Sequence, residues 1–226
     1  MPHAPTPRSR APRFPLASSV PRSGPANRRI IAILALVSLA LGGCGSSFNP
    51  TGPCTADGTA PGAYPELEAA VPTSYAGTAP TRLDSGRTCT AGALGTLASH
   101  GIKELRFAGA TWATGTDSGL TLAVFVTADG PPLDPAWLAE FYETGARSGK
   151  NVQSVDTGEI AIPGGTADGA TGRRIDVLNG ESFQTVVVWP WHGRVAVTLV
   201  ADFIREIQTR GAHDKIVLQA VSAYGP

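Results

Sequence analysis

The sequence predicts a single α+β domain in which a mainly antiparallel sheet packs with three to four helices as an α/β sandwich. Strand-like runs dominate residues 103–201, and Gly-, Asn- and Pro-rich turns of hairpin length separate many of them. Helical patterns occur before, between and after these runs. Short turns favour antiparallel neighbours, because parallel strands need long crossover connections. Residues 64–226 are a suitable length for one domain.

Two short helices are expected ahead of the sheet. The segment 65–71 begins with a first-turn proline and has acids near its start, where the helix dipole favours negative charge. The segment 91–100 has an apolar face, a threonine just before it as a cap and Gly101 as its C-terminal stop. Between them, Asp84-Ser85-Gly86 has the composition of a turn.

A hairpin and a longer helix follow. Strands are expected at 103–112 and 119–127, with a Gly- and Ser-rich turn between them. Both faces of 119–127 are apolar, so this strand should be central in the sheet. Asp134 then caps a helix that extends to Ser148, with Pro135 in its first turn.

The last third of the chain adds further strands and a final helix. Asp214 is expected to cap a helix over 215–224, which has one apolar stripe. Residues 123–129 and 196–202 match in spacing, so an internal duplication is one interpretation. The element order resembles the Mog1/PsbP-like sandwiches of some actinobacterial lipoproteins, a resemblance of fold that implies no chemistry. The expected strands are 152–156, 159–163, 173–178, 182–189 and 194–201.

The first 43 residues have the organisation of an export signal. Arg28-Arg29 precedes an apolar run at 30–41, and Gly42-Gly43 stands just before Cys44. Twelve helical residues would span only about 18 Å, well short of the roughly 30 Å hydrocarbon core. Residues 1–27 are rich in Pro, Ser and Arg, and are either a long signal n-region or the product of a start codon placed too early.

The residues around the expected cleavage site point to a lipid anchor. Leu41-Gly42-Gly43-Cys44 resembles the lipobox of bacterial lipoproteins. The resemblance implies that type II signal peptidase cuts before Cys44 and that a diacylglyceryl group on its sulfur anchors the chain in the lipid bilayer. The alternative is an ordinary signal peptide. Residues 27–31 partly resemble a twin-arginine signal, so the general secretory and twin-arginine routes both stay open.

Residues 44–63 are rich in Gly, Ser, Pro and Thr, which is typical of a flexible tether. If Cys44 is lipidated, Cys54 and Cys89 remain as a pair in an oxidising compartment, which favours a disulfide enclosing 34 residues. The alternatives are two free thiols or a metal pair.

The charge distribution disfavours nucleic acid as a partner. Six of the 18 basic residues lie in the leader, so the chain after it has 12 basic and 18 acidic residues and a net charge of −6. Apart from Arg173-Arg174, this part has no basic cluster that would attract phosphate backbones.

The sequence offers no catalytic, cofactor-binding or metal-binding motif. Ser182 follows Gly180 as in a serine hydrolase elbow, but the second glycine is missing and a strand is expected to follow. His100, His192 and His213 do not have the spacing of metal ligands.

The aromatic segment Val186–Arg194 is the strongest candidate for a contact with a ligand or partner. It places Trp191 and His192 at a turn between strands, where exposed aromatic residues often mark an interface. The favoured interpretation is structural, with Trp189 buried and Trp191 covering a sheet edge beside Pro190. The functional hypothesis is that Trp191 and His192, together with Trp112, contact a small ligand, a glycan or an envelope protein.

These observations predict a lipoprotein on the extracytoplasmic face of the bacterial cell membrane, most simply a non-enzymatic binding or interaction module. One alternative is an envelope or extracellular hydrolase whose active site is assembled from distant residues. Another is a purely structural envelope protein.

Overall fold

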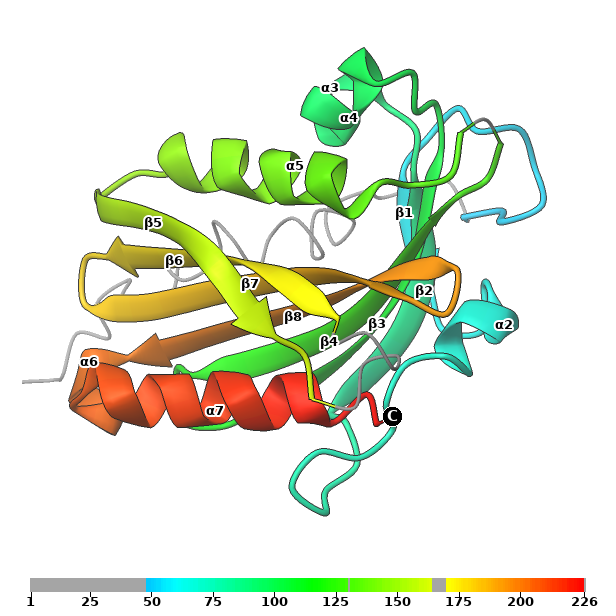
Figure 1. The fold of residues 1–226 in the computed structure, drawn as a ribbon. Helices are drawn as coiled ribbons and strands as arrows, with labels where there is room; N and C mark the ends of the chain where they lie inside the picture. Colours follow the sequence, from blue (N-terminus) through cyan, green and yellow to red (C-terminus); the bar gives the residue numbers. More distant parts are fainter. Residues whose placement is uncertain (1–47, 130, 164–169, 226) are drawn as a thin grey trace, which may run out of the picture.

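The computed structural model describes residues 48–129, 131–163 and 170–225 (Figure 1). The expected leader and Cys44 lie outside these residues. The strands are β1 (Gly58–Ala60), β2 (Arg82–Thr88), β3 (Leu105–Ala113), β4 (Gly119–Thr127), β5 (Val152–Ala161), β6 (Thr171–Asn179), β7 (Ser182–Trp191) and β8 (Arg194–Phe203). The helices are α2 (Pro65–Glu68), α3 (Ala91–Leu94), α4 (Thr96–Ser99), α5 (Pro135–Arg147), α6 (Ile204–Ile207) and α7 (Arg210–Ser222).

The strands form one antiparallel sheet in the order β1-β2-β3-β4-β8-β7-β6-β5. Two four-stranded meanders, β1–β4 and β5–β8, meet where β4 pairs with β8. β4 is therefore central, as its two apolar faces predict. The prediction of a mixed α+β domain with an antiparallel sheet is confirmed.

Helices cover both faces of the sheet (Figure 1). α5 lies on one face, where α3 and α4 join it over a shared apolar core. α7 lies on the other face, and α2 packs on the same side near β2 and β3. Each face has its own buried cluster because the strands alternate their side chains between the two sides.

The helices make up a smaller part of the domain than the predicted three to four helices implied, and the sheet dominates the fold. Among the described residues only α5 and α7 are long, at 13 residues each, and the other four helices have four residues each. The expected helix 91–100 is two separate turns. They are separated by Gly95, whose φ of 53° is left-handed and interrupts the helical path.

β2 corrects the prediction of a turn at Asp84-Ser85-Gly86. These residues are buried in the sheet, and Ser85 accepts a hydrogen bond from the Tyr64 backbone at 2.7 Å while donating to Glu68 at 2.9 Å. A Cβ on Gly86 would lie 2.3 Å from the Gly58 carbonyl oxygen. Glycine is therefore needed at Gly86 for β1 to pair here, and the polar composition reflects local partners rather than a turn.

The final helix begins five residues earlier than expected. Its N-cap is Thr209, whose hydroxyl accepts from the Ala212 backbone N–H at 3.2 Å. Asp214, the expected cap, lies inside α7 and forms ion pairs with Arg174 and Arg210. The two strands expected between 152 and 163 are the single strand β5.

The similar segments 123–129 and 196–202 do not form a structural repeat. They lie in β4 and β8, where Ala123 pairs with Val197. The corresponding residues Ala123 and Ala196 belong to the cores on opposite faces of the sheet. The similarity is one of strand composition.

The expected tether 44–63 is packed structure from Phe48 onward. The buried Arg87 guanidinium donates to the carbonyl oxygens of Asn49, Gly52 and Pro53 at 2.8–3.1 Å. Cys54 and Cys89 form the expected disulfide, with Cα atoms 5.6 Å apart. We call residues 48–54 the N-terminal strap. No helix in the described ranges is both long and apolar enough to cross a bilayer.

Candidate functional site

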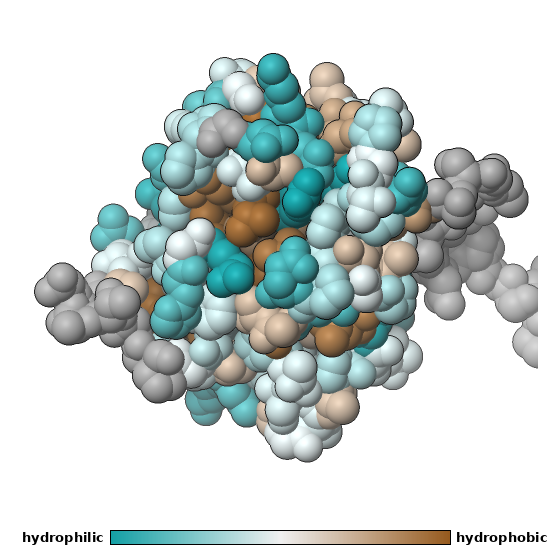
Figure 2. Space-filling view, turned by 90° about the vertical axis from the view of Figure 1, so that its right-hand side faces the viewer, coloured by the Kyte–Doolittle hydropathy of each residue, from teal (hydrophilic) through white to brown (hydrophobic). Residues whose placement is uncertain are grey.

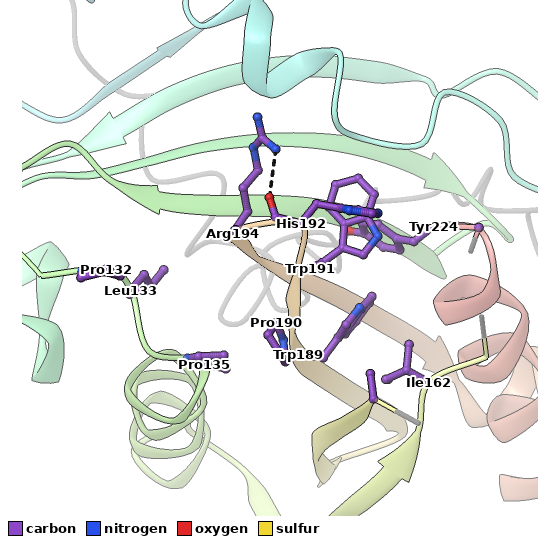
Figure 3. Close-up of a pocket in the computed structure, with 13 residues that line it drawn as sticks. Pro132, Leu133, Pro135, Ile162, Trp189, Pro190, Trp191, His192, Arg194 and Tyr224 are labelled. Carbon is purple, nitrogen blue, oxygen red and sulfur yellow. Dashed lines mark hydrogen bonds between the residues drawn. The ribbon is translucent and has the colours of Figure 1, made fainter. Parts of the chain in front are cut away.

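A pocket of about 410 Å³ opens at the end of the sheet where β7 turns into β8 (Figure 3). We call it the Trp191 pocket. Seen from this end, the molecule shows an apolar hollow bordered by more polar residues (Figure 2). Its walls come from β7 and β8, the segment before α5, the end of β5 and the end of α7. The main lining residues are Leu133, Ile162, Trp189, Pro190, Trp191, His192, Arg194 and Tyr224.

The local sequence builds the pocket through a tight hairpin. His192 and Gly193 have φ values of 47° and 72°, as expected for a two-residue turn of the primed type. Trp191 and Arg194 are the flanking pair of this turn. Trp189 and Trp191 are two residues apart and therefore point to the same side of the sheet, toward α7.

The aromatic side chains support one another. The Tyr224 ring lies edge-on to Trp189 and Trp191, with centroid distances of 4.9 and 5.4 Å. The buried Tyr224 hydroxyl lies 2.7 Å from the Ala123 carbonyl oxygen and 2.9 Å from that of Val197, and these two acceptors share its single proton. Burial raises the pKa of Tyr224 well above its ordinary value. The phenol is thus a neutral and firmly held wall.

The pocket changes from apolar to polar along its depth. Trp189 is 1% exposed, whereas Trp191 is half-buried and His192 is exposed at the rim. The Arg194 guanidinium lies at the same rim, with a weak hydrogen bond to the His192 carbonyl at 3.4 Å (Figure 3). Among the described residues, the buried Trp189 indole N–H has no hydrogen-bond partner. An unpaired buried donor costs about 1–3 kcal/mol.

Two of the three predicted contact residues line this pocket, and the third does not. Trp191 and His192 are at its mouth. Trp112 is in register with Leu120, which pairs with Val200 near the far end of β8. There it is buried, and its indole N–H donates to the Thr78 carbonyl at 3.0 Å.

Sequence analysis missed the contributions of Tyr224 and of the Pro132–Pro135 segment. Tyr224 belongs to the apolar stripe of the last helix, so its burial was predictable. Its position beside Trp189 was not, because that depends on which end of the sheet the helix reaches.

A separate polar network is buried where α7 begins. His213 Nδ1 lies 2.7 Å from Asp202 Oδ2, and His213 Nε2 lies 2.8 Å from the Thr185 hydroxyl. Thr185 in turn lies 2.5 Å from Asp176, to which it donates. A hydroxyl has one proton to donate, so a Thr185 hydroxyl that donates to Asp176 accepts its second hydrogen bond from His213 Nε2. His213 therefore links Thr185 to Asp202 through its two ring nitrogens.

Arginine side chains complete this network from β6 and α7. Arg210 contacts Asp176 at 2.5 Å, and Arg174 contacts both Asp176 and Asp214. Burial acts to raise the pKa of Asp214, but its hydrogen bond and charge interaction with Arg174 outweigh this effect and lower the pKa. The network therefore fixes α7 to β6, β7 and β8.

The order hydroxyl, imidazole, carboxylate also occurs in hydrolases, but here solvent cannot reach it. Thr185, His213 and Asp202 are each fully buried. Ser182, the nearest match to a hydrolase elbow, donates to the Asn179 carbonyl at 2.9 Å and accepts from Gln184. His100 stacks on Trp137 and contacts Glu140.

Within the described ranges, no group of three His, Cys, Asp or Glu side chains is arranged to hold a metal ion. Comparisons with protein-family models, curated proteins and solved structures found no match to this chain. Among the described residues, the Trp191 pocket is therefore the candidate functional site.

Proposed function

We propose that this protein is a membrane-anchored bacterial lipoprotein whose domain lies outside the cytoplasm and binds a small, largely apolar ligand in the Trp191 pocket. The observation that carries the binding role is the cavity of about 410 Å³ with its aromatic walls. Ligand sites are commonly apolar cavities of roughly 300–1,000 Å³ with a few polar groups that orient the ligand.

The anchor is supported by the sequence before the domain. Leu41-Gly42-Gly43-Cys44 follows an apolar run and an arginine pair, as in lipoprotein precursors. The Cys54–Cys89 disulfide fits an oxidising compartment.

The pocket chemistry defines the class of ligand. Indole, phenol, proline and aliphatic groups favour an apolar or aromatic body. The Arg194 rim favours a polar or anionic outer end on the ligand. The buried hydroxyl–imidazole chain at Thr185 offers no comparable access, so the proposed role is binding.

Titration with the neutral fluorescent probe 1-N-phenylnaphthylamine tests the binding role. Trp191→Ala should weaken probe binding about tenfold or more, because losing a large apolar side chain removes roughly 1.5–3 kcal/mol of contact. Trp137→Ala is the matched control: Trp137 is also half-buried but stacks on His100 outside the pocket. Equal binding by the parent and a folded Trp191→Ala variant would exclude this pocket as the binding site.

Mass spectrometry of the protein from bacterial membranes tests the anchor. We expect an N-terminal peptide that begins at Cys44 and carries a diacylglyceryl group. Cys44→Ser should abolish the modification and release the domain from the membrane fraction. An unmodified Cys44 in membrane-derived protein would disprove the anchor without affecting the binding result.

A further inference from the structure

The described structure begins only four residues after the proposed lipid anchor. Phe48 already packs against the core on the α7 face, so residues 45–47 alone separate Cys44 from the folded domain. Four residue steps reach at most about 14 Å. A domain of this size has a radius of gyration of about 16 Å, so the anchor cannot allow it to turn freely above the membrane.

The N-terminal strap is fixed to one particular end of the sheet. Arg87 binds three of its carbonyl oxygens, and the Cys54–Cys89 disulfide ties it to the residue after β2. Detaching residues 48–53 would expose the buried Arg87 guanidinium, and detaching the chain beyond Cys54 would also require breaking the disulfide. The end of the sheet that carries Arg87 must face the lipid surface.

The mouth of the Trp191 pocket lies at the same end. The strand register places Val195, Phe125, Phe107 and Gly86 in one row across β8, β4, β3 and β2. Three strand spacings of about 4.8 Å put the β7–β8 turn about 14 Å across the sheet from the strap. Figure 1 shows this turn and the segment leading into β1 at the same end of the molecule.

From these positions we infer that the β7–β8 turn, Trp191 to Arg194, lies against the bilayer and that the Trp191 pocket opens toward the lipid. The inference rests on the proposed lipidation of Cys44. Its partner is the membrane interface itself, and a pocket in this orientation would receive its ligand from the lipid phase.

The chemistry of the turn suits that interface. Trp and Tyr rings are favoured at the headgroup level, and an arginine can place its apolar stem among lipids while its charge stays near the phosphates. The segment 182–201 contains no acidic residue, whereas Glu181 and Asp202 stand just outside it. The chain after the leader has a net charge of −6, so this acid-free turn suits an anionic surface better than the average surface of the domain does.

Thiol accessibility in native membranes tests the orientation. His192→Cys places a thiol at the tip of the turn, and Asn151→Cys is a matched control at the opposite end of the sheet. Both parent residues are exposed and have left-handed φ values, 47° and 63°, so the two substitutions have similar backbone costs. The native cysteines do not interfere, because Cys54 and Cys89 are joined and Cys44 would be lipidated.

A membrane-impermeant maleimide should modify the thiol of His192→Cys about fivefold more slowly in membranes than after detergent release, since interfacial groups sit within the headgroup layer. The rate for Asn151→Cys should change by less than about twofold. A labelled His192→Cys should also be quenched by spin-labelled lipids, and a labelled Asn151→Cys should not.

Equal protection of the two thiols, or stronger protection at Asn151→Cys, would overturn the orientation while leaving the anchor intact. The Cys44 peptide from the same samples reports the anchor separately. If that peptide is unmodified, the proposed function loses its anchor and this inference fails with it.

Discussion

The two faces of the sheet are covered by helices of equal length that are held by different chemistry. α5 buries Leu138, Ala139, Tyr142 and Ala146 in a continuous apolar core. α7 buries His213 at its start, in a network of charges, and apolar residues further along. Apolar contacts supply strength with little directional preference, whereas the hydrogen-bonded charges at His213 fix the position of α7.

This difference matters for the pocket. Tyr224 lies just beyond α7, so the position of this helix determines where the phenol stands relative to Trp189 and Trp191. The polar network at one end of α7 therefore supports the aromatic wall at the other end.

The largest loss of stability is expected when the buried His213–Asp202 contact loses one of its two side chains. His213→Ala should lower the free energy of unfolding by about 3–5 kcal/mol, because it leaves the fully buried Asp202 side chain without its partner. Urea unfolding with the disulfide intact measures the loss. Asp202→Ala added to His213→Ala should recover part of it, since no unpaired Asp202 side chain then remains at that site. A loss below about 1 kcal/mol for the single variant would show that the network is not needed to hold α7.

A somewhat smaller loss is expected on the apolar face. Leu138→Ala should cost about 3 kcal/mol in the same assay, through lost apolar contact and the cavity left under α5. Leu218→Ala on α7 is the control, because Leu218 is 45% exposed and its removal should change stability by less than about 0.5 kcal/mol. If Leu138→Ala costs more than His213→Ala, the ranking of the two faces is wrong.

The smallest effect at neutral pH is expected at Tyr224. Tyr224→Phe should cost about 1 kcal/mol, the typical worth of one hydrogen bond. At alkaline pH the difference in stability between Tyr224→Phe and the parent protein is expected to reverse, in favour of the variant. Burial raises the pKa of Tyr224, so the folded phenol stays neutral while the unfolded one ionises near pH 10. Its contribution is fully present below about pH 10 and is lost above it.

The stability of Tyr224→Phe should therefore fall less steeply than that of the parent between about pH 9 and 11. All four tyrosines have raised pKa values because of burial. Phenolate absorbance of the native protein should consequently rise at a higher pH than that of the unfolded chain. Phenolate formation near pH 10 in protein with native circular dichroism would contradict this prediction.

The sequence predicted the two long helices, α5 and α7, with unequal success. α5 was predicted closely because its signals are local: Asp134 accepts from the Ala136 N–H, and Pro135 stands in the first turn. α7 was predicted to start too late. Its capping Thr209 precedes polar residues, and His213 reads as polar surface unless its partners on β7 and β8 are known.

At the Trp191 pocket, too, the sequence predicted neighbours in the chain but not partners that are distant in sequence. The aromatic turn at Trp191 was singled out because its residues are adjacent in the chain. Trp112 was grouped with it by residue type alone, although the register places it near the other end of the sheet. Tyr224 reaches the pocket through α7, and no sequence pattern near Trp191 could indicate that.

By itself, the sequence determined the mixed α+β class, the antiparallel sheet with its central strand, the Cys54–Cys89 pair and the aromatic turn. These features depend on side-chain periodicity, capping and turn chemistry, which act over a few residues, or on a simple count of cysteines. Only the tertiary structure decided that Gly86 pairs in a strand, that residues from Phe48 form a strap and that His213 lies in the core between Thr185 and Asp202. Each of these depends on a partner distant in sequence. Residues of this composition are usually found in exposed turns, tethers or surfaces, and here they are packed against such partners.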